Sequence, residues 1–156
     1  MVQNTYFHCA PIKLGAGSII EAGNWGRLVE MHDWADAGNV QRDFAELAME
    51  YGRRTLQPNA PSRLNCVFCL EDEESARNYM AQFARLSVLH QVEPVEVGGR
   101  LPALFRTKYS LIWALNVDAL SPLKALETNI QQYWQGNPDT DVEVLIGGAV
   151  RVVQSL

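Results

Sequence analysis

Apolar side chains recur at helical spacing in three segments of the chain. In the first, residues 40–56, the apolar residues Val40, Phe44, Leu47 and Tyr51 lie three or four positions apart. Polar and charged residues fill the other face, and two prolines follow at once. This spacing is typical of an amphipathic helix that the prolines end.

The second and third helical segments also carry signals for where they begin and end. Four consecutive acidic residues, 71–74, precede an apolar stripe that includes Ala76 and Phe83, and acids favour the first turn of a helix. In the third segment, Ser121-Pro122 is a helix start and Gly136 is a helix end. The stripe between them consists of Leu123, Leu126, Ile130, Tyr133 and Trp134.

Short runs of β-type sequence separate the helical segments. They are predicted at residues 5–10, 65–70, 87–97 and 109–117, and two more lie in residues 142–153 around Gly147-Gly148 as a tight hairpin. Strands and helices alternate irregularly, and the last two strands are consecutive. This order favours an α+β fold over a doubly wound sheet, in a single domain that spans residues 1–156.

Composition and charge narrow the classes of function. The 156 residues (17.5 kDa) are 47% hydrophobic and 20% charged, which is ordinary globular usage. Thirteen basic against eighteen acidic residues give a net charge of −5, which argues against binding to extended duplex nucleic acid. No apolar run is long enough for a membrane span, and the N-terminal sequence has no secretory pattern. Three cysteines without such a signal indicate reduced thiols in the cytoplasm.

Two common kinds of site are disfavoured by the motifs. Cys66 and Cys69 form a C-x-x-C without a second pair, and in a strand their side chains would point to opposite faces. We therefore expect no metal site, and interpret both thiols as small buried hydrophobes. The chain has neither the glycine-rich dinucleotide motif nor a phosphate-binding loop with its lysine.

Three other residues could carry chemistry, and each also has a structural interpretation. His8 in the first strand could be a hydrogen-bonded core residue, and Tyr79 could be a core aromatic or a stacking surface. Glu143 lies inside the apolar run VEVLI, where an unpaired carboxylate would be costly. It must therefore face solvent, meet a partner or line a functional site.

The order of these segments resembles the ADP-ribosyltransferase superfamily. The N-terminal pattern is similar to the opening of bacterial rifampin ADP-ribosyltransferases, and it consists of Tyr6, His8, Leu14, Gly17, Ile20 and Gly23. NCVFCLEDEESARNYM resembles a strand–helix unit that poly(ADP-ribose) polymerases share. DVEVLI (residues 141–146) resembles a segment of arginine-directed transferases whose second acid is catalytic. The chain is also similar to a group of small bacterial proteins of unknown function.

The resemblance implies a fold and a set of residue roles. The fold would be a split antiparallel or mixed β-sheet core with about three flanking helices. Glu143 would be the catalytic acid, bonded to the nicotinamide-side ribose of NAD. The residues expected to bind the dinucleotide are His8 on the adenine-side ribose, the Cys9 backbone on the carboxamide, and Phe68 or Tyr79 stacked on nicotinamide. We add Arg63 as a phosphate ligand because its guanidinium can bind bidentately.

The activity that the resemblance implies is mono-ADP-ribosyl transfer from NAD, with no metal. The acceptor stays open between protein, nucleic acid and small molecule. Asp141 and Trp25 are the residues expected on the acceptor side, and Trp25 is the tryptophan that we expect to be best exposed. An intracellular toxin or defence factor would fit this chemistry. A second interpretation is a non-catalytic NAD- or partner-binding module, because Cys9 stands where the family usually has glycine.

Overall fold

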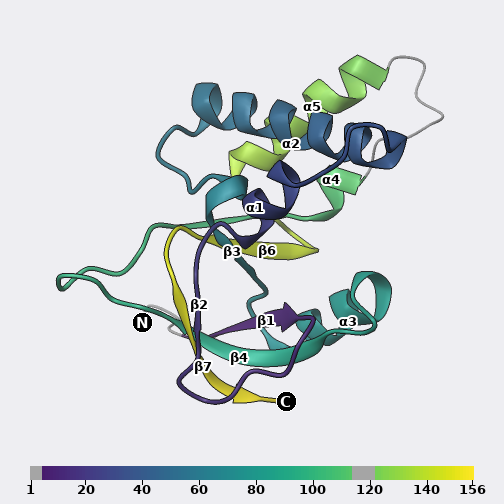
Figure 1. Ribbon diagram of the computed structural model, residues 1–156. Coiled ribbons are helices and arrows are strands. Elements are labelled where there is room, and N and C mark those ends of the chain that lie inside the picture. The colour runs from purple at the N-terminus through teal and green to yellow at the C-terminus, as the bar shows by residue number, and fades with distance from the viewer. Residues whose placement is uncertain (1–4, 114–121) are drawn as a thin grey trace.

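The chain folds into two antiparallel β-sheets with helices around them (Figure 1). The computed structural model describes residues 5–113 and 122–156. The four-stranded sheet has the order β1 (Tyr6–Ala10), β4 (Val88–Pro94), β7 (Val150–Ser155) and β2 (Ile19–Ile20). The three-stranded sheet has the order β3 (Val67–Cys69), β6 (Val142–Ile146) and β5 (Leu104–Lys108). The predicted α+β class is confirmed.

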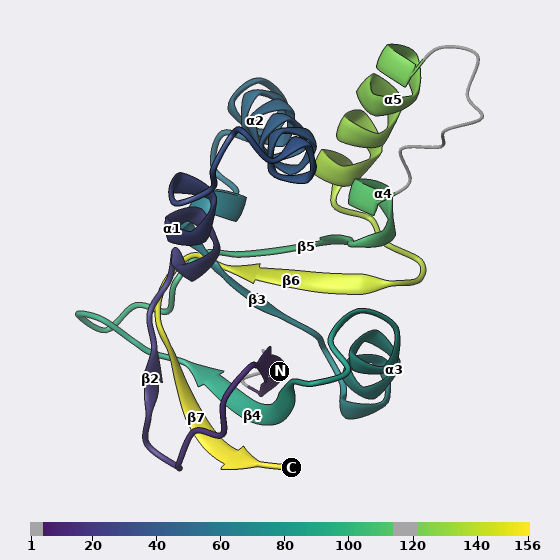
Figure 2. The ribbon, with the colours of Figure 1, turned by 45° about the vertical axis from the view of Figure 1, so that its right-hand side comes forward.

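Helices gather on one side of the three-stranded sheet, as Figure 2 shows. They are α1 (Asn24–Glu30), α2 (Ala37–Leu56), α4 (Ser110–Trp113) and α5 (Pro122–Gln135), whereas α3 (Glu73–Phe83) packs beside β1 and β4. The three longest, α2, α3 and α5, are those that the apolar spacing predicts, and Gly136 ends α5 with a φ of 72°. Ser121, the expected cap of α5, lies outside the described residues. Among those residues, no helix is long and apolar enough to cross a membrane.

A backbone bridge links the two sheets. Phe7 in β1 and Leu70 just after β3 exchange both backbone hydrogen bonds, at 3.0 and 2.8 Å. A buried apolar cluster fills the space between the sheets, with side chains such as Val92, Val144 and Val152. The ends of β1 and β3 are therefore held side by side, although about 60 residues separate them in the sequence.

Two strand predictions are wrong. The expected hairpin around Gly147-Gly148 does not form, because β6 belongs to the three-stranded sheet and β7 to the other. The backbone of Gly147 bonds to Ala103 instead, and the chain crosses between sheets at this point. The strand expected at residues 109–117 lies earlier, as β5, and helix α4 begins at Ser110; residues 114–117 lie outside the described part.

Helix α2 buries the face that its amphipathic pattern would leave in solvent. The apolar stripe of Val40, Phe44, Leu47 and Tyr51 is 40% to 64% exposed, whereas Asp43 and Glu46 are buried. Both acids have partners that offset the cost of burial. Asp43 accepts hydrogen bonds from the rings of His32 (2.6 Å) and Trp34 (2.8 Å). The inward face of α2 is thus mixed: Ala45 and Met49 are buried beside the two acids, whose burial is compensated by specific hydrogen bonds.

Two glycines allow close packing of helices α1 and α2 against their neighbours. A Cβ at Gly26 in α1 would lie 2.1 Å from the backbone oxygen of Leu64, so only glycine lets α1 rest on η1 (Arg63–Asn65), a 3-10 helix. A Cβ at Gly52 in α2 would lie 2.2 Å from the Ile130 side chain of α5. These contacts fix α1, α2 and α5 relative to η1.

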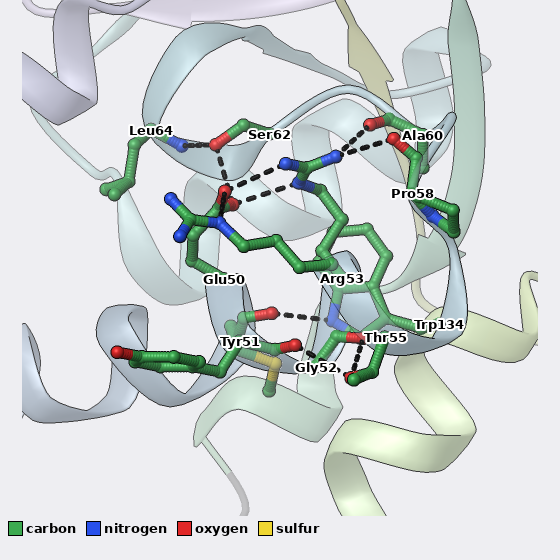
Figure 3. A network of polar contacts seen from close by, with 12 residues as sticks. Glu50, Tyr51, Gly52, Arg53, Thr55, Pro58, Ala60, Ser62, Leu64 and Trp134 are labelled. Carbon is green, nitrogen blue, oxygen red and sulfur yellow. Dashed lines mark hydrogen bonds and ion pairs between the residues drawn. The ribbon is translucent and has the colours of Figure 1, made fainter.

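A network around Glu50 fastens the loop after α2 to the helix itself (Figure 3). Arg53 donates from Nε and Nη2 to the Glu50 carboxylate at 3.0 and 2.9 Å, and Ser62 donates to it at 2.9 Å. Arg53 also donates from Nη1 to the backbone oxygens of Pro58 and Ala60. The hydrogen bonds from Arg53 hold the pKa of Glu50 at about 2. This network sets the position of the loop that leads to η1.

We predict that Glu50→Gln lowers the free energy of unfolding by about 2 kcal/mol at pH 7, because it removes a charged partner of Arg53. The carboxyl is ionised at a lower pH in the folded than in the unfolded chain. Its contribution is therefore complete above the unfolded pKa of 4.5 and is lost as the pH falls toward 2. Urea unfolding at pH 7 and pH 3 measures this, and the gap between wild type and variant should narrow at pH 3. A gap that is constant with pH would contradict the prediction.

Candidate functional site

A cavity of about 340 Å³ opens where the two sheets meet, beneath α1 and α2. Seven of the eight residues that the sequence marks as candidates line it, namely His8, Cys9, Trp25, Arg63, Phe68, Tyr79 and Glu143. The eighth, Asp141, is exposed just ahead of β6 with a φ of 53°, and it forms a hydrogen bond with Tyr109. The structure therefore brings together residues from β1, α1, η1, β3, α3 and β6, but leaves Asp141 outside.

Glu143 reaches the cavity because of its register in β6. This strand is central in its sheet, and core clusters cover both of its faces, so its sequence is almost wholly apolar. Val144 and Ile146 point into the core between the sheets, and alternation directs Glu143 and Leu145 toward the helices. Only 7% of Glu143 is exposed, so the carboxylate depends on neighbours for compensation.

The compensation for Glu143 comes from Arg63 and Tyr133. Arg63 donates from Nη1 to Glu143 Oε1 at 3.0 Å, and the Tyr133 hydroxyl of α5 donates to the same oxygen at 2.6 Å. Arg63 also donates from Nη1 to the Tyr133 oxygen at 2.6 Å. Among the described residues, none donates a hydrogen bond to Glu143 Oε2. One carboxylate oxygen, Oε1, is thus held in place by two donors.

Arg63 has a second carboxylate partner, Glu46 of α2. Its Nε and Nη2 donate to the two oxygens of Glu46 at 3.0 and 2.9 Å, which is the bidentate geometry of a strong ion pair. All three charged side chains are buried. A phosphate, the ligand predicted for Arg63, would have to compete with Glu46, which already occupies the fork of the guanidinium. Neither Glu46 nor Tyr133 was singled out as a site residue from the sequence, since helical spacing alone cannot show what a buried side chain meets.

Burial controls the ionisation of Glu143. It raises the pKa of this carboxyl above its usual 4.5, and the negative charge of Glu46 acts in the same direction. The positive charge of Arg63 and the hydrogen bond from Tyr133 act in the opposite direction. Glu143 is thus a carboxyl whose charge depends on three named neighbours.

His8 has a defined tautomer. Its Nδ1 lies 2.8 Å from the backbone oxygen of Phe68, and a carbonyl can only accept, so Nδ1 carries the proton. Burial lowers the pKa of the ring, which keeps it neutral at pH 7. Nε2 is then an unprotonated acceptor on a side chain that lines the cavity.

Aromatic rings form much of the remaining wall. Tyr79 packs edge-on against Tyr109 with ring centres 5.0 Å apart, and burial raises the pKa of Tyr79 to about 12. The Arg63 guanidinium lies over the ring of Phe68 at 4.8 Å. Phe68 therefore has a cation over its ring. The ring contacts of Tyr79 in the described part of the chain are with other aromatic residues.

Trp25 and Arg42 form the side of the cavity toward α1 and α2. Trp25 is half-buried, and its indole donates to Glu46 Oε1 at 2.9 Å. It is not the best exposed tryptophan, since Trp34 is 71% exposed. Arg42 is exposed, with its guanidinium 5.9 Å from the centre of the Trp25 ring. Arg42 has no carboxylate partner in the described part of the chain, and it was missed from the sequence because it is one of several charges on α2.

The cysteines do not form a metal centre with their neighbours. Within residues 5–113 and 122–156, no group of three or more histidine, cysteine or acidic side chains is placed to hold a metal. Cys66 and Cys69 are 2% and 0% exposed, which confirms that they are buried side chains. Cys9 is half-buried and lines the cavity.

Comparison with known families gives a match without a described activity. Residues 16–156 match the family model described as "Protein of unknown function (DUF2441)". No curated protein matches the chain.

We predict that Cys9 reacts slowly with iodoacetamide. Burial raises the pKa of its thiol to about 11, so very little thiolate is present at pH 8. The expected rate is roughly 100-fold below that of an unperturbed thiol, since the thiolate is the reactive form. Mass spectrometry after timed labelling measures the rate, with urea-unfolded protein as the control in which all three cysteines react. Labelling of folded Cys9 at the rate of a free thiol would contradict the prediction.

Proposed function

The protein belongs to the DUF2441 family, and we propose that it is a mono-ADP-ribosyltransferase that takes NAD as its donor. The observation that carries the proposal is the meeting of His8 and Glu143 in one cavity, although 135 residues separate them in the sequence. The sequence resemblance requires an aromatic wall and one carboxylate around the nicotinamide half of NAD, and an acceptor imidazole at the adenine-side ribose. A cavity of about 340 Å³ is within the range of small-ligand sites.

The arrangement of the sheets supports the finer fold assignment. We propose that the two antiparallel sheets, joined at Phe7 and Leu70, correspond to the split core of ADP-ribosyltransferases. In that arrangement the ligand cleft would lie at the split. The cavity lies at this junction, with His8 and Cys9 on one side and Phe68 and Cys69 on the other.

Each group around the cavity has a role in binding the donor. His8 would accept a hydrogen bond from a ribose hydroxyl at Nε2. The Cys9 backbone would hold the carboxamide. The N–H and C=O of Phe7 point away from β4 and bond to Leu70. Because backbone groups alternate along a strand, the N–H and C=O of Cys9 point to the same edge as those of Phe7. Tyr79 or Phe68 would stack on the nicotinamide ring. Arg42, rather than Arg63, would meet the diphosphate, because its guanidinium is exposed at the cavity.

Glu143 would act on the charge that develops during the reaction. The bond between nicotinamide and ribose C1′ breaks, and its electron pair leaves with nicotinamide, which becomes neutral. The ribose gains oxocarbenium character, and a nearby carboxylate in a site of low dielectric stabilises this cation. Glu143 Oε2 would accept from the ribose 2′-hydroxyl and hold the sugar in place. The acceptor then forms a bond to C1′ and loses a proton.

A non-catalytic binding module is a second candidate, and one observation favours it. Oε1 of Glu143 is engaged in the buried network with Arg63 and Tyr133, which is what a purely structural acid would also show. Such a module would keep the cavity and bind NAD or a partner without turnover.

We predict that Glu143→Gln abolishes nicotinamide release from NAD, by roughly 100-fold or more, because the substitution removes the charge but keeps the shape. NAD affinity, measured by calorimetry, should change little. The matched control is Glu93→Gln, which removes an exposed carboxylate paired with Arg151 on the four-stranded sheet and should release nicotinamide at the wild-type rate.

The outcomes separate the two candidates. Loss of release in Glu143→Gln with a native amide spectrum supports the enzyme. Equal rates of nicotinamide release in variant and wild type would show that Glu143 takes no part in the reaction. NAD binding to the wild type without any release supports the binding module instead.

A second prediction concerns His8. His8→Ala should weaken NAD binding by about 10-fold, the effect of one lost hydrogen bond between neutral groups in a buried site. The midpoint of thermal unfolding should fall by only a few degrees, because a half-buried side chain is removed. Calorimetric titration with NAD and a thermal melt give the two values. A large fall in the melting temperature with unchanged affinity would assign His8 to the core.

A further inference from the structure

We propose that Glu46 is a positioning residue for Glu143: by holding the fork of Arg63, it prevents that cation from cancelling the charge that Glu143 offers to the cavity. This inference rests on the role proposed for Glu143 and extends it to a residue on another element. It concerns how the charge is divided between two carboxylates and one guanidinium.

The geometry divides Arg63 unequally between its two partners. Glu46 receives Nε and Nη2 on separate oxygens, whereas Glu143 receives Nη1 alone, on an oxygen that it shares with the Tyr133 hydroxyl. Bidentate contacts between guanidinium and carboxylate are the stronger kind. The positive charge is therefore directed mainly at Glu46, and the three side chains together carry one excess negative charge when both acids are ionised.

Glu46 is itself anchored, which makes its hold on Arg63 stable. Trp25 donates to Glu46 Oε1 from α1, and that helix is fixed on η1 through the contact between Gly26 and Leu64. Glu46 is 3% exposed and lines the same cavity as Glu143. Removing its charge would free the fork to turn toward Glu143, the next carboxylate within reach.

Most other ionisable groups around Glu143 are in a fixed state at pH 7. They come from every element around the carboxyl, namely His8, Cys9, Arg42, Arg63, Cys66, Cys69, Tyr79, Tyr109 and Tyr133. Burial raises the pKa of the thiols and the tyrosine hydroxyls, so these are neutral at pH 7. Burial acts to lower the pKa of Arg63, but the Tyr133 hydroxyl and the carboxylates around it raise that pKa above its usual value, so this guanidinium stays charged. Burial lowers the pKa of His8, so the ring is neutral at pH 7. Glu46 is thus the neighbouring negative charge that a substitution can remove.

The experiment is a titration of the Glu143 carboxyl by carbon-detected NMR in isotope-labelled protein without NAD, with the signal assigned through Glu143→Gln. Glu46→Gln should lower the pKa of Glu143, because it removes a negative charge and releases the Arg63 fork. Tyr133→Phe should raise it, because the hydrogen bond to the carboxylate is lost. Shifts of opposite sign from two neighbours of one network are not expected from mere loosening of the structure.

Nicotinamide release gives the second readout. In Glu46→Gln the acid limb of the pH–rate profile should move to lower pH, while the plateau falls roughly 10-fold as Arg63 compensates the carboxylate. The matched control is Glu93→Gln in β4, where an exposed acid is also paired with an arginine, Arg151. It should leave the Glu143 titration and the plateau unchanged.

Each outcome decides the proposal. A Glu143 pKa that is unchanged or higher in Glu46→Gln, or that moves equally in Glu93→Gln, overturns it. Where Glu46→Gln does not fold, Glu46→Asp replaces it, because the shorter side chain cannot hold both Arg63 nitrogens and should lower the pKa by less. Opposite shifts without nicotinamide release in the wild type would overturn the proposed function and leave the charge division intact.

Discussion

The structure depends on one buried cation. Arg63 lies among two carboxylates, a tyrosine hydroxyl and two aromatic rings, and an arginine left without such partners would cost several kcal/mol to bury. Because Glu46 is on α2, Glu143 on β6 and Tyr133 on α5, this single side chain connects the helices to the three-stranded sheet. A change in any of these elements is transmitted to the wall of the cavity, so stability and the state of the site are linked.

The same network explains why the cavity can be polar inside a small protein. The buried charges Glu46, Arg63 and Glu143 are tolerated there because each has a partner with good geometry, and the partners come from helices and strands. On the inner side of α2, the buried acids Asp43 and Glu46 lie beside apolar contacts such as that of Met49. The apolar stripe of that helix, from Val40 to Tyr51, faces solvent instead.

Local patterns in the sequence were reliable where a single physical signal dominates. Apolar spacing located α2, α3 and α5, and the glycine after α5 has the positive φ that a helix end needs. The acid in the apolar strand was recognised as an exception that requires a partner or a site, and Glu143 has both. Local signals failed where two alternatives share the same pattern. The pattern of two strands joined by a turn fits a hairpin and a crossing between sheets equally well. In this chain β6 and β7 lie in different sheets.

By itself, the sequence determined the fold class, most of the long elements and a set of candidate residues, because periodicity, capping and the cost of a buried charge act over short distances along the chain. Only the tertiary structure decided which of these residues share a cavity, that Arg63 is held by Glu46 rather than left for a ligand, and that Asp141 lies apart. These outcomes depend on contacts between residues that are 17 to 80 positions apart, such as those of Arg63 with Glu46 and Glu143. No local pattern encodes such pairings, because they form only after the sheets and helices have packed.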